Sequence, residues 1–422
     1  MDDMQRPDPG RRTRSGVGTF SWAHLAAVLG PGIVAMLADT DAGSLVTAAQ
    51  SGAQWGYRLL WLQLILIPVL YITQELTVRL GAVTGESHGA LIKRHFGAFW
   101  AGVAVVTLAV ACMGALLTEM GGLAGIGAML GIPNWITMAL VVVALALMAV
   151  TGSYRSVERI ALGAGAFEVV FLIVAVWAHP KVGEVARQFV SIPVTDGRYM
   201  FLVSANIGAV IMPWMVFYQQ SSVVEKGLKP TDIKTERVDT AIGAVVTQLV
   251  MGAVVVACAA ALQHGGKAGH LETVQQIADA LTPVLGQAIG RLAFGVGFAG
   301  AAIVAAIVVT LTAARGLGEL VGYGHTLDKP LGEAPWFYLV YLAVLVSGAA
   351  FIVGGADVVA LAVGVQVLNA LLLPIVLGFL YLLARRLPEP FRLAGAYNAL
   401  VAAVLAVTVA LGLYSGIAGL WK

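Results

Sequence analysis

The sequence predicts an all-α membrane protein with about eleven transmembrane helices, of which the first and the sixth are interrupted. Of the 422 residues, 59% are hydrophobic and 11% are charged, and the mean hydropathy is +0.87. This composition is typical of a polytopic membrane protein and not of a soluble domain with a large core. Within two of the long apolar runs, acidic residues or a proline interrupt the helical pattern. These breaks predict where a ligand binds.

The spans are assigned from runs of roughly 20 apolar residues, the length that crosses a bilayer as a helix. The segment 271–284 is short and amphipathic, which predicts an interfacial helix on the outer side. The expected spans are 24–53, 57–78, 99–130, 135–151, 158–178, 198–226, 239–263, 286–314, 335–353, 357–383 and 391–420.

Residues 1–20 are polar and rich in Pro, Gly and Arg, so we expect a disordered tail followed by a single transmembrane domain, 21–422. The first apolar segment is too long for the core of a cleaved signal peptide. Basic residues gather on the side of the tail, which places the tail in the cytoplasm by the positive-inside rule. We expect the protein in the inner (plasma) membrane. Examples are Arg11, Arg12, Arg14, Lys93, Arg94, Lys226, Lys229, Arg385 and Arg386.

The first span contains two carboxylates, Asp39 and Asp41. An ionised side chain in hydrocarbon costs a few kcal/mol or more unless it faces a cavity, pairs or binds an ion. The run from Asp41 to Ser44 consists of weak helix formers and predicts an unwound segment. Carbonyls freed there, together with a carboxylate, form a site for a hard cation. The alternative is a continuous core helix whose aspartates bond to neighbouring helices.

The sixth span is interrupted by Pro213, which removes a backbone donor and frees carbonyls near Ala209 and Val210. Interrupted spans in the first and sixth positions indicate an inverted repeat of five spans plus five, with the substrate site between the two breaks. The eleventh span lies outside this repeat.

Other classes of protein find little support. Cys112 and Cys258 lie in apolar runs and are expected to be buried hydrophobic residues. The net charge of +2, without a basic and aromatic cluster, does not indicate nucleic-acid binding. A membrane-embedded enzyme or a receptor is the weakest alternative, because the chain contains no His-Glu-x-x-His motif, phosphate loop or nucleophile elbow.

Several motifs resemble those of the Nramp (SLC11) divalent-metal transporters, which have a LeuT-like architecture. The similarity extends from about residue 22 to residue 400 and is specific as a set. The motifs are Gly30-Pro31-Gly32, Asp41-Ala42-Gly43-Ser44 in place of DPGN, the run Gly56 to Trp61 (GYRLLW), the run Gln74 to Gly81 (QELTVRLG), Ala209 with Met212-Pro213-Trp214 in place of MPH, and Gln366 eight residues before Pro374.

The resemblance implies a metal site made by Asp41, Ser44, the Ala209 carbonyl, Met212 and Gln366. Carboxylate and carbonyl oxygens suit hard divalent ions, and a thioether adds a softer ligand that favours Mn, Fe or Co over Mg and Ca. Met212 could instead fill space in the core, and Gln366 could instead bond to another helix.

The departures from the family concern proton-carrying groups. Trp214 and Gln219 stand where the family has histidines, and Gly122 stands where the family has the second acid of a pair whose first member is Glu119. Asp39 is an acid where the family usually has none. We therefore expect Asp39 and Glu119 to carry any proton coupling, while Asp41 binds the cargo.

The predicted function is secondary active transport of a divalent cation such as Mn²⁺ or Fe²⁺ by alternating access. The metal is then the substrate, with no cofactor, and the lipid bilayer and a coupled proton are the expected partners. The first alternative keeps the fold but carries Mg²⁺ or a small organic solute that packs on Trp214. The sequence does not indicate an oligomeric state.

Overall fold

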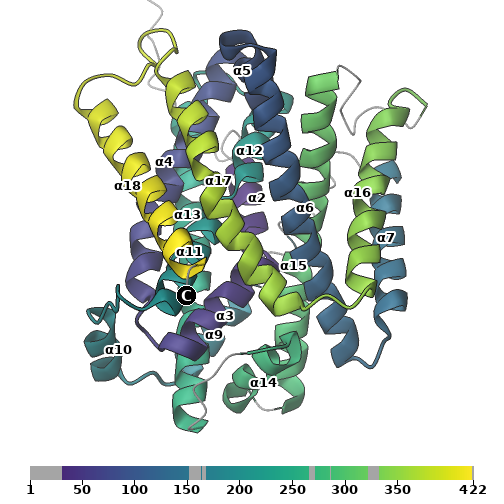
Figure 1. Cartoon of the computed structure of the whole chain (residues 1–422), viewed down its shortest axis with the longest axis vertical. Coiled ribbons are helices and arrows are strands. Elements are labelled where there is room, and N and C mark those ends of the chain that lie inside the picture. The colour runs from purple at the N-terminus through teal and green to yellow at the C-terminus, as the bar shows by residue number, and fades with distance from the viewer. Residues whose placement is uncertain are drawn as a thin grey trace, which may run out of the picture.

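The computed structural model describes residues 31–151, 163, 168–265, 271–285, 287–321 and 332–420, and the regular elements within these ranges are helices (Figure 1). The predicted tail, 1–20, lies outside the described residues. The helices are α2 (Pro31–Asp39), α3 (Ala42–Trp55), α4 (Leu60–Thr84), α5 (His88–Phe96), α6 (Ala98–Met129), α7 (Asn134–Thr151), α9 (Val169–Trp177), α10 (Val182–Phe189), α11 (Gly197–Val210), α12 (Pro213–Glu225), α13 (Ile233–Gly265), α14 (Val274–Leu285), α15 (Gln287–Val321), α16 (Pro335–Val353), α17 (Val358–Ala384) and α18 (Gly395–Leu420).

Eight stretches of the described chain are long and apolar enough to cross a membrane: α4, α6, α11 with α12, α13, α15, α16, α17 and α18. The other three predicted spans, 24–53, 135–151 and 158–178, coincide with α2 and α3, α7 and α9, which are shorter in the described residues. Residues 24–30, 158–162 and 164–167 lie outside those residues. The predicted interfacial helix is α14, at the end of the molecule opposite α5 (Figure 1).

The first predicted helix break is present, but it lies earlier than the run from Asp41 to Ser44. Helix α2 ends at Asp39 and α3 begins at Ala42, so Ala42, Gly43 and Ser44 form the first turn of α3. Asp41 has extended backbone and caps this turn, because its side chain accepts a hydrogen bond from the Ser44 N–H. An N-cap of this kind satisfies one of the donors that a helix start leaves free. The weak helix formers are therefore tolerated inside α3.

The second predicted break lies at Ile211 and Met212, between α11 and α12. Pro213 occupies the first turn of α12, where a missing N–H costs nothing and the ring favours the helical φ angle. Met212 has extended backbone, with φ −88° and ψ 138°. The proline therefore begins the second half-helix as well as ending the first.

A glycine brings the two broken spans against the same partner helix. A Cβ on Gly208 of α11 would lie far inside contact distance of the Gln366 carbonyl and 2.7 Å from the Ala370 nitrogen, both on α17. The backbones of α11 and α17 therefore touch one residue before Ala209. Helix α3 also packs against α11 and α17. This packing holds the two breaks and Gln366 in one region of the core.

An ion network centred on the buried Glu75 joins helices at the end of the molecule near α5. The sequence predicts that Glu75 and Arg79 pair four residues apart on one helix. This is confirmed: the Arg79 guanidinium donates to both carboxylate oxygens of Glu75, at 2.6 and 2.8 Å. Arg237 of α13 also donates to Glu75, at 2.7 Å, which the sequence alone did not indicate. The network ties α4 to α13.

Candidate metal site

The centre of the candidate site is the Asp41 carboxylate, which is fully buried at the N-terminus of α3. Its Oδ1 accepts from the Ser44 N–H at 2.6 Å. Its Oδ2 has no hydrogen-bond partner in the part of the chain that the structure describes. A buried carboxylate oxygen without a donor is costly, and a bound cation would remove that cost.

Ser44 joins the two breaks. Its hydroxyl donates to the carbonyl oxygen of Ala209 at 2.9 Å, across 165 residues of sequence. Both atoms are oxygen donors with further lone pairs, since a hydroxyl and a carbonyl can each accept in two directions. The structure thus brings Asp41, Ser44 and Ala209 together, as the resemblance implies.

Met212 and Trp214 contact each other at the second break, and both are fully buried. The indole Nε1–H of Trp214 donates to the Met212 sulfur, with an N to S distance of 3.2 Å. The sulfur that the resemblance makes a metal ligand is therefore already engaged by a protein donor.

Gln366 reaches the first turn of α3. Its Nε2 has no partner in the described chain and lies where a Cβ on Gly43 would be, while its Oε1 accepts from Asn369 Nδ2 at 2.9 Å. The Asn369 Oδ1 is also without a partner among the described residues. Turning both amides over keeps a hydrogen bond between them and directs the Gln366 oxygen towards Gly43. In that orientation Gln366 offers an oxygen ligand.

Glu119 of α6 adds a second carboxylate beside Asp41. Its Oε2 accepts from the Ala42 N–H and its Oε1 from the Thr118 hydroxyl, both at 3.0 Å. Its carboxyl group also lies close enough to Asp41 for the two groups to interact directly. The positive end of the α3 dipole favours negative charge at this terminus, so the two carboxyl groups can offer anionic oxygen ligands to a cation.

Asp39 and Gln219 have different surroundings. Asp39 is buried, and both of its carboxylate oxygens are without hydrogen-bond partners among the described residues. It lies within electrostatic range of Asp41 and of Glu168, the residue just before α9. The Gln219 amide instead bonds to the hydroxyls of Thr77 and Thr240, at 3.1 and 3.5 Å. Gln219 thus links α12 to α4 and α13.

The structure gives a reason for Gly122. A Cβ at this position would lie 2.7 Å from the Ala42 Cβ and 2.8 Å from Cε1 of Phe298. The ring of Phe298, on α15, occupies the space that a second acid on α6 would need. Sequence reasoning did not identify Phe298, because nothing in an apolar run distinguishes one aromatic residue as a neighbour of the site.

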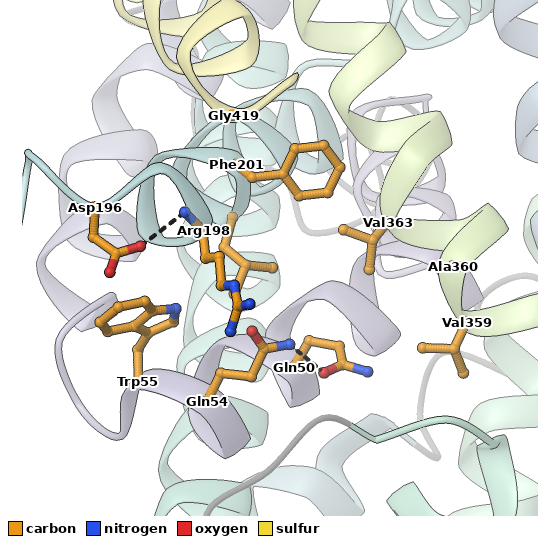
Figure 2. Close-up of a pocket in the computed structure, with 11 residues that line it drawn as sticks. Gln50, Gln54, Trp55, Asp196, Arg198, Phe201, Val359, Ala360, Val363 and Gly419 are labelled. Atoms are coloured by element: carbon orange, nitrogen blue, oxygen red, sulfur yellow. Dashed lines mark hydrogen bonds between the residues drawn. The ribbon is translucent and has the colours of Figure 1, made fainter. Parts of the chain in front are cut away.

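A cavity of about 840 Å³ lies between α3, α11 and α17, beyond the site (Figure 2). Gln50 and Gln54 line it from α3, and Arg198 extends from α11 towards their amides. Val363, three residues before Gln366, lines the α17 side. None of the buried ligand candidates lines this cavity, so the site is closed to it. Gln50 also exchanges two hydrogen bonds with the backbone of Leu271, before α14.

The geometry suits an ion held by mixed donors. The described residues contain no group of three or more His, Cys, Asp or Glu side chains that could hold a metal by themselves. The available donors are instead one or two carboxylates, a hydroxyl, a backbone carbonyl, an amide and a thioether, all recruited from the two breaks, α6 and α17. Sites built at broken helices in membrane transporters use such donors for cations.

Comparisons with solved structures identify the fold. The solved structure of the Eremococcus coleocola manganese transporter, in complex with an aromatic bis-isothiourea substituted compound, has a TM-score of 0.77 at 17% identity, covering 94% of this chain and 87% of that one. Mhp1, a nucleobase-cation-symport-1 family transporter in a closed conformation, has a TM-score of 0.60 at 16% identity, covering 93% and 91%. These likenesses confirm the predicted LeuT-like fold.

Sequence comparisons give the family. The chain is 26% identical to the divalent metal cation transporter MntH of Aeromonas hydrophila over 339 residues, 75% of this chain and 80% of that protein. It is 25% identical to the MntH of Klebsiella pneumoniae over 295 residues, 68% and 70%. The family model described as natural resistance-associated macrophage protein-like (Nramp) matches residues 32–418. The chain therefore belongs to the Nramp family, as its motifs predicted.

Proposed function

We propose that this protein is a secondary transporter that moves a divalent metal cation across the inner membrane by alternating access, with Asp41 as the charged ligand. The observation that carries the proposal is the unpartnered, fully buried Asp41 oxygen beside the Ser44 to Ala209 contact that joins the two helix breaks. Relatives in the family are named divalent metal cation transporters and a manganese transporter, which supports Mn²⁺ as the first cargo to test.

The position of the site supports alternating access. Four of the proposed ligands, Asp41, Ser44, Ala209 and Met212, lie where half-helices end or begin, and α12 and α3 can each tilt without stretching an intact helix. The cavity between α3, α11 and α17 ends about one helix turn from Gln366, since Val363 precedes Gln366 by three residues at about 1.5 Å each. A small movement of α3 and α11 apart would therefore open the site to that cavity.

The proposal is tested with the wild-type protein. Mn²⁺ is expected to raise the unfolding temperature of the purified protein in detergent, because a ligand that binds only the folded state stabilises it. Reconstituted in liposomes, the protein is expected to take up Mn²⁺, with empty liposomes as the control. If none of Mn²⁺, Fe²⁺, Cd²⁺ and Mg²⁺ protects the protein against heat or is taken up into liposomes, the protein is not a metal transporter.

We also propose that proton movement accompanies cation transport and depends on Asp39. The histidines that the family has at the positions of Trp214 and Gln219 are absent, and an indole or an amide does not carry a proton at neutral pH. Asp39 and Glu119 are buried acids that interact with Asp41.

For Asp39→Asn in liposomes that contain a pH-sensitive dye, we expect cation uptake to persist while cation-linked proton movement falls several-fold. The substitution removes the exchangeable proton but keeps the size of the side chain. If proton movement in the variant equals that of the wild type, Asp39 has no role in proton coupling and serves only the structure of the helix break. A cation-uptake assay on the same vesicles shows that the variant is folded.

A further inference from the structure

We propose that Trp214 sets the cation preference of the site by holding a lone pair of the Met212 sulfur in a hydrogen bond, so that hard cations are favoured over soft ones. This inference rests on the proposed transport of a divalent cation. It adds a role for a residue that does not itself contact the ion.

The contact that carries the inference is the 3.2 Å separation between the indole Nε1 and the Met212 sulfur. A thioether is only a weak acceptor, and an indole N–H has no function as an acceptor, so the direction of the bond is fixed. Trp214 lies two residues after Met212, across the first turn of α12, and is among the largest fully buried side chains. Because the side chain is fully buried, its N–H has no water to bond to. Losing the sulfur contact would therefore leave a buried donor without an acceptor, which costs free energy.

The backbone of the break holds the pair in place. Met212 is the extended N-cap residue of α12, and Pro213 locks the turn between Met212 and Trp214. The Met212 backbone carbonyl accepts from the Met215 N–H at 3.1 Å, which further fixes the first turn. The indole therefore reaches the sulfur through a short and rigid connection.

The consequence for an ion follows from ligand softness. A thioether stabilises Cd²⁺ and, more weakly, Mn²⁺ by donating a lone pair, but it contributes little to Mg²⁺ or Ca²⁺. A hydrogen bond to the sulfur withdraws electron density and occupies one of the directions from which an ion can approach. The other donors, among them Asp41, Ser44 and the Ala209 carbonyl, bind through oxygen atoms, which suit hard ions. The bond therefore lowers the affinity for soft ions selectively.

The experiment compares Cd²⁺ and Mg²⁺ binding to the purified full-length protein by calorimetric titration in wild type and in Trp214→Phe. Phenylalanine keeps an aromatic ring but removes the N–H. The Cd²⁺ affinity is expected to rise about 3- to 10-fold, the factor that corresponds to one net hydrogen bond, while the Mg²⁺ affinity changes less than about 2-fold. Equal changes for the two ions would overturn the proposal.

A double-mutant cycle with Met212→Leu isolates the sulfur. In that background Trp214→Phe is expected to leave the Cd²⁺ to Mg²⁺ affinity ratio unchanged. If Trp214→Phe still raises the affinity for Cd²⁺ relative to Mg²⁺ when the sulfur is absent, the proposal is overturned. Trp55→Phe is the matched control: Trp55 lines the cavity between α3, α11 and α17, and its indole nitrogen is buried without a partner in the described chain. The ion preference of Trp55→Phe is expected to equal that of the wild type.

Two further outcomes are distinguishable. Wild-type protein that binds neither ion contradicts the proposed function itself, whereas binding without a Trp214 effect contradicts only this inference.

If Trp214→Phe does not fold, X-ray absorption at the cadmium edge in the wild-type protein tests the proposal instead. A full sulfur contribution to the coordination sphere of bound Cd²⁺ overturns the proposal, and a sphere made of oxygen atoms supports it.

Discussion

Asp41→Asn is expected to abolish cation binding and uptake together. Asparagine keeps the size of the side chain and can still accept the hydrogen bond from the Ser44 N–H that begins α3. It loses the negative charge that offsets the desolvation of a divalent ion in a fully buried site. The affinity is expected to fall about 100-fold or more, which corresponds to about 2.7 kcal/mol or more. Calorimetric titration with Mn²⁺ and uptake into liposomes measure the two effects.

The matched control for this substitution is Asp279→Asn, which removes the same charge from an exposed ion pair with Arg291. Exposed pairs of this kind are worth about 0–1 kcal/mol, so Mn²⁺ binding is expected to be unchanged. Because a cap residue is retained in Asp41→Asn, the unfolding temperature without metal is expected to stay close to that of the wild type. Wild-type Mn²⁺ affinity in Asp41→Asn would remove Asp41 from the site.

The breaks themselves could be predicted from the sequence, because each depends on local chemistry. Pro213 cannot continue a helix, and buried carboxylates at Asp39 and Asp41 require partners or an ion. The position of the first break was predicted slightly too late. A glycine and a serine lower helix propensity by less than about 1 kcal/mol each, and the Asp41 cap and burial in the core outweigh this.

The contacts that shape the site could not be predicted from the sequence. The hydrogen bond from Ser44 to Ala209 joins residues 165 positions apart, and its existence depends on how α3 and α11 pack. The same is true of Phe298, which fills the space beside Gly122. A pattern of apolar residues identifies the helices but does not determine which of their faces meet.

The contact between Trp214 and Met212 could be predicted from the sequence only in part. The two residues are neighbours in the sequence, and the replacement of the family histidine by tryptophan was visible there. On a continuous helix, the side chains of residues two positions apart are separated by about 200° around the helix axis, so they do not meet. They meet here because Met212 is extended while Trp214 is helical. The contact therefore exists only because the span is broken.

The second large effect is expected for Gly208→Ala. The added methyl group would lie inside contact distance of the Gln366 carbonyl and 2.7 Å from the Ala370 nitrogen. Both atoms belong to the backbone of α17, so neither can rotate away, and α11 and α17 must separate. Forced overpacking of this kind is expected to cost about 2–4 kcal/mol, seen as a lower unfolding temperature in detergent. Since Ala209 and Gln366 flank the contact, Mn²⁺ affinity is expected to fall as well.

Gly364→Ala provides the control on the same helix, two residues before Gln366. A Cβ there would meet no atom within 4 Å, and the residue lies inside α17. Replacing a helical glycine by alanine reduces the entropy of the unfolded chain, so this variant is expected to gain about 0.5 kcal/mol or to match the wild type. Loss of stability in both variants would mean that α17 tolerates no change in this region. Loss in Gly208→Ala alone locates the constraint at the backbone contact that aligns the two broken spans.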